Sequence, residues 1–190
     1  AVSAILNITP DHLDRHHTME CYQRTKEDIT RNQTKEDICV LNYEDEECQR
    51  FAKSCPAKVV FFSSKQKLRD GYYFEDGRIF VAKDGVASLV IAVNELNLWG
   101  MHNYENVMAA CAMAEGFGVP MEKIVEVLKI FTAVEHRIEY VTTKRGVKFY
   151  NDSKGTNTDA AIQGIRAMTG TTFLIGGGYD KQSEYDEWIQ

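Results

Sequence analysis

Short apolar runs alternate with segments of helical periodicity, and this alternation restricts the possible folds more than any other feature of the sequence. The runs Ala4–Ile8, Ile38–Leu41 and Val59–Phe62 have the length and composition of buried strands. The segments between them, Cys21–Asn32 and Glu44–Lys53, carry helical patterns. Strands that alternate with helices form parallel sheets with helical crossovers. We therefore expect an α/β fold with a mostly parallel sheet.

Small antiparallel hairpins are expected next along the chain. The segments Tyr72–Glu75, Arg78–Ala82 and Ala87–Val93 read as strands, and the dipeptides Asp76-Gly77 and Asp84-Gly85 separate them. An Asp-Gly pair between two strands is a strong signal for a tight hairpin turn.

Two helices should follow the hairpins, the second beginning near Pro120. The apolar residues that share a helix face are Val107, Cys111 and Ala114 in the first and Ile124, Leu128 and Phe131 in the second. Near residue 138 the pattern restarts as a hairpin, a polar loop, a helix and a strand at Thr172–Ile175. We therefore expect a domain boundary there, with residues 1–138 in one domain and residues 139–190 in the next.

Composition and charge exclude several classes of protein. The chain has 190 residues, 44% of them hydrophobic and 26% charged, which is ordinary for a soluble globular protein. A net charge of −6 argues against a nucleic-acid partner. No apolar run approaches the roughly 20 residues of a membrane span, so we expect no membrane insertion. The five cysteines show no Cys-x-x-Cys pairing, which favours free thiols and a cytoplasmic location.

Residues 151–157, Asn-Asp-Ser-Lys-Gly-Thr-Asn, form the most informative polar segment of the chain. They follow an alternating, strand-like segment and precede a helical pattern. In α/β folds such a loop, at the carboxyl end of a strand, is where ligands bind. Its backbone N–H groups and the helix N-terminus also suit an anion. The alternative is a strand-to-helix turn in which an Asn or Thr caps the helix.

This segment resembles the signature of the D-glutamate-adding Mur ligases. Three further segments fit the family in the same order, namely Asn7–Arg15, Gly100–Asn106 and His136-Arg137. The segments Gly100–Asn106 and His136-Arg137 are shared with other Mur ligases and with folylpolyglutamate synthases, whereas residues 151–157 distinguish this group. Gly155 replaces the alanine that the family usually has.

The resemblance implies a fold and a position within a longer protein. Residues 1–138 would be part of the central ATP-binding domain, and residues 139–190 would begin a Rossmann-like, amino-acid-binding C-terminal domain. The family's phosphate loop, which ends in Gly-Lys-Ser/Thr, has no counterpart here, because Gly176–Gly178 is followed by Lys181 without a Ser or Thr after it. We therefore expect an internal fragment that is inactive by itself.

The resemblance also implies a reaction. The whole enzyme would join D-glutamate to UDP-N-acetylmuramoyl-L-alanine in peptidoglycan synthesis, using ATP and Mg²⁺ and acting as a monomer. The substrate carboxylate would attack the γ-phosphate to give an acyl phosphate, which the amine of D-glutamate would then attack. Positioning and charge neutralisation would supply most of the catalysis.

The resemblance assigns His12 and Lys26 to a magnesium ion. Lys26 would be carbamylated by CO₂, which converts a cation into an anionic oxygen ligand. Only a neutral amine reacts with CO₂, and nearby metal cations would disfavour the ammonium form. Asn7 would lie near the nucleotide phosphates.

The remaining assignments from the resemblance divide between nucleotide and amino acid. The residues assigned to the nucleotide are His102, Asn103, Asn106, Arg137 and Asp152. The residues assigned to D-glutamate are Thr156, Asn157 and Lys181. Lys154 would neutralise the charge that develops on the acyl phosphate and the tetrahedral intermediate, and so would act both in catalysis and in substrate binding.

Other interpretations of these residues stay open. The nearest is another ligase of the superfamily, such as a folylpolyglutamate synthase. A different class would be a metal-dependent hydrolase built on His12, His16 and His17, because clusters of histidine and aspartate bind metals. Without the resemblance, Lys26 would be interpreted as a solvated charged residue on a helix. His102 or Asn103 could simply cap the helix that they begin.

Overall fold

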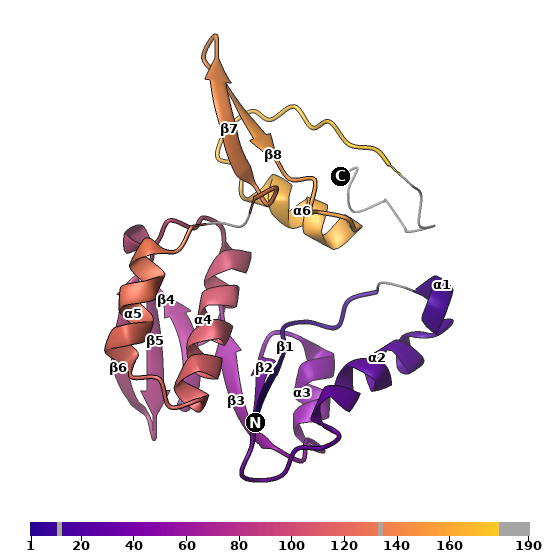
Figure 1. Cartoon of the computed structure of the whole chain (residues 1–190), viewed down its shortest axis with the longest axis vertical. Coiled ribbons are helices and arrows are strands. Elements are labelled where there is room, and N and C mark those ends of the chain that lie inside the picture. The colour runs from indigo at the N-terminus through magenta and orange to yellow at the C-terminus, as the bar shows by residue number, and fades with distance from the viewer. Residues whose placement is uncertain (11–12, 133–134, 179–190) are drawn as a thin grey trace. The chain divides into compact units, whose positions relative to one another are not determined.

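The computed structural model describes residues 1–10, 13–132 and 135–178. Its chain divides into two compact units, residues 1–131 and residues 132–190, which are described separately (Figure 1). None of the helices in the described ranges is long and apolar enough to cross a membrane.

A six-stranded sheet in the order β1-β2-β3-β4-β5-β6 forms the centre of the first unit. Its strands are β1 Val2–Ile5, β2 Ile38–Asn42, β3 Lys58–Ser63, β4 Gly71–Glu75, β5 Arg78–Lys83 and β6 Val86–Ala92. The pairs β1–β2, β2–β3 and β3–β4 are parallel. The pairs β4–β5 and β5–β6 are antiparallel. The mostly parallel sheet is confirmed, and the expected hairpins extend that same sheet.

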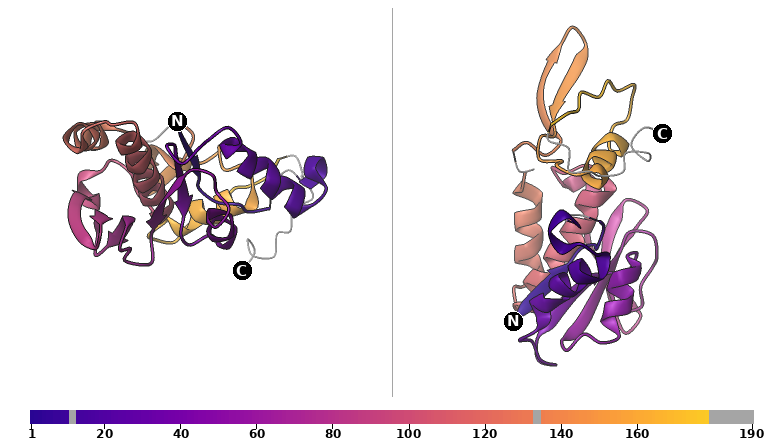
Figure 2. Two further views of the ribbon diagram at one scale, coloured as in Figure 1. Left: turned by 90° about the horizontal axis from the view of Figure 1, so that it is seen from below. Right: turned by 90° about the vertical axis from the view of Figure 1, so that its right-hand side faces the viewer.

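Helices cover both faces of this sheet (Figures 1 and 2). The helices of the first unit are α1 Leu13–His16, α2 Met19–Glu27, α3 Glu46–Ala52, α4 Met101–Gly116 and α5 Met121–Ile130, with 3₁₀ turns η1 Asp28–Thr30 and η2 Val93–Glu95. Two buried clusters result. Val40 of β2 packs in the cluster that contains α4 and α5. Its neighbours Cys39 and Leu41 pack in the cluster that contains α2 and α3.

The first strand ends earlier than the sequence indicates, at Ile5 rather than Ile8. Beyond Ile5 the backbone bonds to side chains instead of a neighbouring strand. The Leu6 carbonyl accepts a hydrogen bond from Asn42 Nδ2 (3.0 Å), and the Ile8 N–H donates to Asp45 Oδ2 (2.8 Å). The apolar run therefore continues although the strand does not.

The two Asp-Gly turns have the geometry expected of tight hairpins. Asp76 and Gly77 have φ angles of 47° and 72°, and Asp84 and Gly85 have φ angles of 52° and 81°. Positive φ at both central residues is typical of the type I′ turn, whose twist matches that of the flanking strands.

Helix α4 runs antiparallel to the parallel strands. Its last residue, Gly116, lies so close to the start of the sheet that a Cβ there would be 3.0 Å from Ile38 Cδ1. At its other end Glu105 accepts a hydrogen bond from Ser64, which directly follows β3 (2.5 Å). The N-terminus of α4 therefore lies at the carboxyl edge of β1–β3, where α/β folds bind ligands.

Glu115 fastens the C-terminal part of α4 to the antiparallel strands. Its carboxylate accepts hydrogen bonds from the buried Tyr72 hydroxyl (2.7 Å) and from Lys83 Nζ (2.7 Å). Burial alone would raise the pKa of Glu115, but these two donors outweigh it and hold that pKa below its ordinary value.

All five cysteines are free thiols, as expected. Burial raises the pKa of Cys39, Cys48 and Cys111 to about 12. The reactive form of cysteine is the thiolate, so a raised pKa keeps these three thiols unreactive. Their side chains therefore contribute to the packing of the core.

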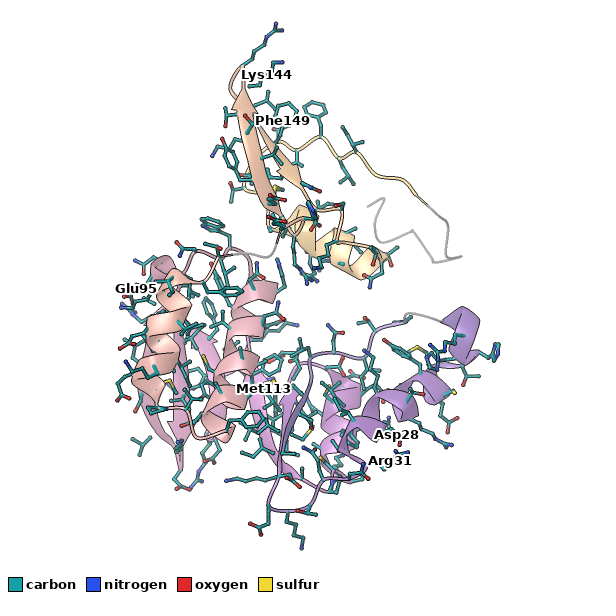
Figure 3. All side chains as sticks on the ribbon, in the orientation of Figure 1. Asp28, Arg31, Glu95, Met113, Lys144 and Phe149 are labelled. Atoms are coloured by element: carbon teal, nitrogen blue, oxygen red, sulfur yellow. The ribbon has the colours of Figure 1, made fainter. Side chains whose placement is uncertain are left out.

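The second unit contains a hairpin and a helix. Its elements are β7 Glu139–Lys144, β8 Val147–Asn151 and α6 Thr158–Arg166. Lys144 lies at the tip of the hairpin (Figure 3). The hairpin, polar loop and helix are confirmed, but the strand expected at Thr172–Ile175 is wrong. Phe173 and Ile175 are 90% and 98% exposed, and no described strand pairs with this segment, so it lacks the ladder that defines a strand.

The start of β4 requires a glycine. Strand β4 pairs with β3 in parallel only at Phe62↔Tyr72 and Ser63↔Tyr73, so β4 begins beside the end of β3. Residues 64–70 are therefore long enough to connect these two parallel strands. At that point Gly71 has a φ of 122°, and a Cβ there would lie 2.3 Å from the Phe61 carbonyl oxygen.

We predict that Gly71→Ala lowers the free energy of unfolding by about 3 kcal/mol, because the methyl group must displace backbone. Gly118→Ala is the matched control, since Gly118 has a φ of 84° but has no atom within 4 Å of its Cβ position. It should cost only the conformational strain, roughly 1–2 kcal/mol. Urea unfolding of both variants measures the difference, and equal losses would contradict the steric explanation.

Candidate functional site

Polar side chains line the carboxyl edge of the parallel strands. Asn42, at the end of β2, is 7% exposed and donates to the Leu6 carbonyl beyond β1. Its Oδ1 accepts from the Glu44 N–H (2.8 Å). The Glu44 carboxylate in turn accepts from Ser63 Oγ at the end of β3 (2.5 Å). The ends of three strands are thus tied together through side chains.

The same edge continues to α4 through Ser64 and Glu105. Buried hydroxyls and amides need such partners, because an unpaired polar group inside a protein costs stability. None of these edge residues was identified from the sequence. The available signal was a polar residue directly after an apolar strand, as Asn42 follows Leu41 and Ser63 follows Phe62.

The first two turns of α4 carry His102, Asn103 and Asn106, all partly buried. Gly100, with a φ of 92°, is the N-cap residue, and it has no side chain that could cap the helix. Asn103 Nδ2 donates to the Trp99 carbonyl (2.7 Å). Neither His102 nor Asn103 is therefore the N-cap residue, and their assignment to the nucleotide stays a prediction.

Asn7 and Lys26 line one groove of about 320 Å³. Its remaining walls are the apolar residues Ala4 and Ile5 of β1, Leu6 directly after it, and Ile29 of η1. Lys26 Nζ lies 5.3 Å from the centre of the Tyr22 ring, a distance at which a ring face attracts an ammonium group. Two residues that the sequence assigned to phosphate and metal chemistry thus share one hollow of the surface.

The proposed metal ligand His12 lies outside the described residues. His16 packs against Tyr22 with ring centroids 5.3 Å apart, and His17 is exposed with a φ of 63°. Within the described part of the chain, no group of three His, Cys, Asp or Glu side chains is arranged to hold a metal ion.

In the second unit the loop after β8 is strongly organised. Asn151 Oδ1 accepts from the Ser153 N–H (3.0 Å), and the Asp152 carbonyl accepts from the Gly155 N–H (2.9 Å). Lys154 and Thr156 are exposed within it. The arrangement presents an ammonium and a hydroxyl to solvent on a fixed backbone.

Asn157 is the N-cap of α6, since its Oδ1 accepts from the Ala160 N–H (2.8 Å). The alternative that an Asn or Thr of this loop caps the helix is thus confirmed for Asn157, and Thr156 is not the cap. Asp152 Oδ1 accepts from the Ile138 N–H (3.0 Å), so this carboxylate already has a partner inside the unit. Arg137, which directly precedes Ile138 in the chain, is exposed. Lys181, assigned to D-glutamate, lies outside the described residues.

Comparison with known sequences gives consistent matches. The sequence model of the Mur ligase middle domain matches residues 1–114. A UDP-N-acetylmuramoylalanine–D-glutamate ligase of Lachnoclostridium phytofermentans is 58% identical over 189 residues, covering 100% of this chain and 42% of the relative. The ligase of that name from Lachnospira eligens is 57% identical over 190 residues, with the same coverage. The chain thus spans less than half the length of these relatives.

Solved structures resemble the fold. MurF from Acinetobacter baumannii has a TM-score of 0.65 at 23% identity, and the match covers 89% of this chain and 38% of the MurF chain. A pseudomurein peptide ligase type C from Methanothermus fervidus has a TM-score of 0.67 at 19% identity, covering 89% of this chain and 41% of its own. At such identities the likeness concerns architecture alone, and it agrees with the predicted α/β fold.

Proposed function

Because the chain belongs to the Mur ligase family, we propose that the whole protein joins D-glutamate to UDP-N-acetylmuramoyl-L-alanine. ATP would be cleaved to ADP and phosphate, and the product would serve peptidoglycan synthesis. The single observation that carries this proposal is the identity of 58% over the full chain with a ligase named for these two substrates. The nearest rival is a folylpolyglutamate synthase, another ligase of the same superfamily.

Four residues would contact the nucleotide. We propose His102, Asn103 and Asn106 for the adenine and phosphate side and Arg137 for a phosphate or ribose contact. An always-charged planar guanidinium suits such contacts. Residues 1–138 would then belong to the ATP-binding domain and residues 139–190 to the amino-acid-binding domain. The enzyme would act as a monomer in the cytoplasm.

A magnesium ion would be held by His12 and by Lys26 in its carbamate form. The groove that Asn7 and Lys26 both line supports this, because a residue proposed to lie near the phosphates and one proposed for the metal share one hollow. As an ammonium, Lys26 cannot ligate a cation, so the site fits magnesium only after carbamylation. The ion would supply neutralisation of phosphate charge.

In the second unit the chemistry would depend on Lys154 and Thr156. Lys154 would stabilise the negative charge of the tetrahedral intermediate, and Thr156 would bind a carboxylate of D-glutamate. Asn157 and Lys181 would complete the amino-acid site. Exposure of Lys154 and Thr156 on a hydrogen-bonded loop supports these roles.

The proposal is tested by phosphate release from the full-length protein with ATP and magnesium. We expect turnover only when D-glutamate and UDP-N-acetylmuramoyl-L-alanine are both present. Turnover with L-glutamate and a folate would favour the superfamily rival. Hydrolysis that needs a divalent metal but neither substrate would favour a metallohydrolase.

Lys154 and Thr156 should affect different kinetic constants. We predict that Lys154→Ala lowers kcat about 100-fold or more, because its charge acts in the transition state. Thr156→Ala should raise the KM for D-glutamate about 10-fold and leave that for ATP unchanged. Steady-state kinetics measures both, with Lys148→Ala on β8 as the control for removing an exposed lysine. Equal effects of Thr156→Ala on both substrates would refute its assignment.

Lys26→Ala should abolish activity, because an alanine cannot form the carbamate that would ligate magnesium. Millimolar acetate or another short carboxylic acid should restore part of the activity by supplying the missing anion. Lys35→Ala, which removes another exposed lysine, should behave like wild type with or without acid. Full activity of Lys26→Ala without acid would rule out the carbamate.

A further inference from the structure

Strand β6 is an exposed edge of the six-stranded sheet. It is the last strand in the order β1-β2-β3-β4-β5-β6, and among the described strands it pairs only with β5. The backbone groups on its outer side therefore lack a ladder partner. Such a row of N–H and C=O groups is a template on which an extended segment of another chain can add as a further strand.

The sequence of β6 does little to protect this edge. Natural edges are blunted by charges, prolines or bulges, but Val86–Ala92 contains neither a charged residue nor a proline. A register shift against β5 leaves Val90 without an opposite residue, so the regular edge ends at Leu89. Residues 86–89 are all exposed, with Val86 at 72% and Leu89 at 56%. Four regular edge residues, two of them large and apolar, thus face solvent.

A groove of about 410 Å³ lies between β6 and α5, which are in contact (Figure 1). Its apolar walls are Leu89 and Val90 of β6 and Met121 and Val125 of α5. Its charged residues all come from α5, namely Glu122, Glu126 and Lys129. The stretch 122–129 of a helix is about 10 Å long, and four strand residues span about 13 Å. Groove and regular edge therefore match in length, and both suit about four extended residues.

The charged side of the groove has one carboxylate without a partner in the described part of the chain. Lys123 Nζ lies 2.8 Å from Glu126 Oε2, and Lys129 Nζ lies 2.7 Å from Glu95 Oε1. The lysine at Glu95 also holds the pKa of that carboxyl below its ordinary value. Both lysines are thus paired, whereas Glu122 has no ion pair there. A basic side chain on the occupant would complement Glu122 and give specificity more than affinity.

We propose that β6 and α5 form a docking site for an extended segment of another protein, which adds to the sheet as a further strand. The backbone of that segment pairs with residues 86–89, two apolar side chains two residues apart enter the groove, and a lysine or arginine faces Glu122. In this mode of recognition the backbone bonds supply affinity, and pockets for alternate side chains supply specificity. The docking site shares no residue with the candidate ligase site, so it does not depend on the proposed function.

Fluorescence anisotropy with the labelled peptide acetyl-Lys-Val-Thr-Val-Lys-amide and the 190-residue chain tests the groove. The two valines are spaced for it, and a lysine at each end can face Glu122 in either chain direction. We expect saturable binding, which Leu89→Gln weakens about 10-fold because it removes an apolar wall. Val127→Gln is the matched control, since Val127 is 57% exposed on α5 but does not line the groove. No saturation at millimolar concentration, or equal effects of the two variants, would overturn the proposal.

The charge match is tested with a second peptide, in which glutamate replaces both lysines. We expect the wild type to bind the lysine peptide at least 5-fold more tightly than the glutamate peptide, and Glu122→Lys to reverse this preference. A preference that Glu122→Lys leaves unchanged would refute the basic character of the occupant.

Two N-methylated forms of the lysine peptide test the addition of a strand. Methylation of both valine nitrogens removes the N–H groups on one edge of the extended peptide, and methylation of the threonine and last lysine nitrogens removes those on the other edge. Only one of the two forms should lose binding, by at least 10-fold. Equal losses, or none, would rule out backbone pairing. Sedimentation velocity of the chain alone excludes the other occupant, because a dimer that Leu89→Gln dissociates would show that a second copy covers this edge.

Discussion

The parallel strands of the first unit are covered by helices on both faces, and the rest of that unit depends on this burial. On β2, Val40 packs under α4 and α5, while Cys39 and Leu41 pack under α2 and α3. A strand buried on both sides reads as a continuous apolar run, and it leaves only its ends for polar chemistry. The carboxyl edge therefore holds polar residues that can face a ligand.

Hydrogen bonds convert that edge into a fixed surface. Asn42, Glu44 and Ser63 connect the ends of β1, β2 and β3, and the contact of Ser64 with Glu105 extends the connection to α4. The first turns of α4 are thereby fixed relative to the strands. Preorganised positions matter in a ligase, because phosphoryl transfer depends on orientation and charge more than on covalent help from the protein.

The second unit uses the same principle in a smaller space. In its loop after β8, Lys154 and Thr156 face solvent, while Asn151 and Asp152 bond to His136 and Ile138 before β7. A polar motif in a sequence need not consist of ligand contacts throughout. Here the residues that bond inward and the residues that face solvent alternate within one loop.

The sequence alone determined the α/β class, the Asp-Gly hairpins and the segments in which the candidate site residues lie, because periodicity and turn chemistry are local properties. It also placed Lys154 and Thr156 in a loop between a strand and a helix. Tertiary structure decided the rest. Only the fold brought Asn7 and Lys26 into one groove, and only pairing could show that Thr172–Ile175 lacks a neighbouring strand. The partner of Asp152 was equally hidden, because its bond to Ile138 joins residues that only folding brings together.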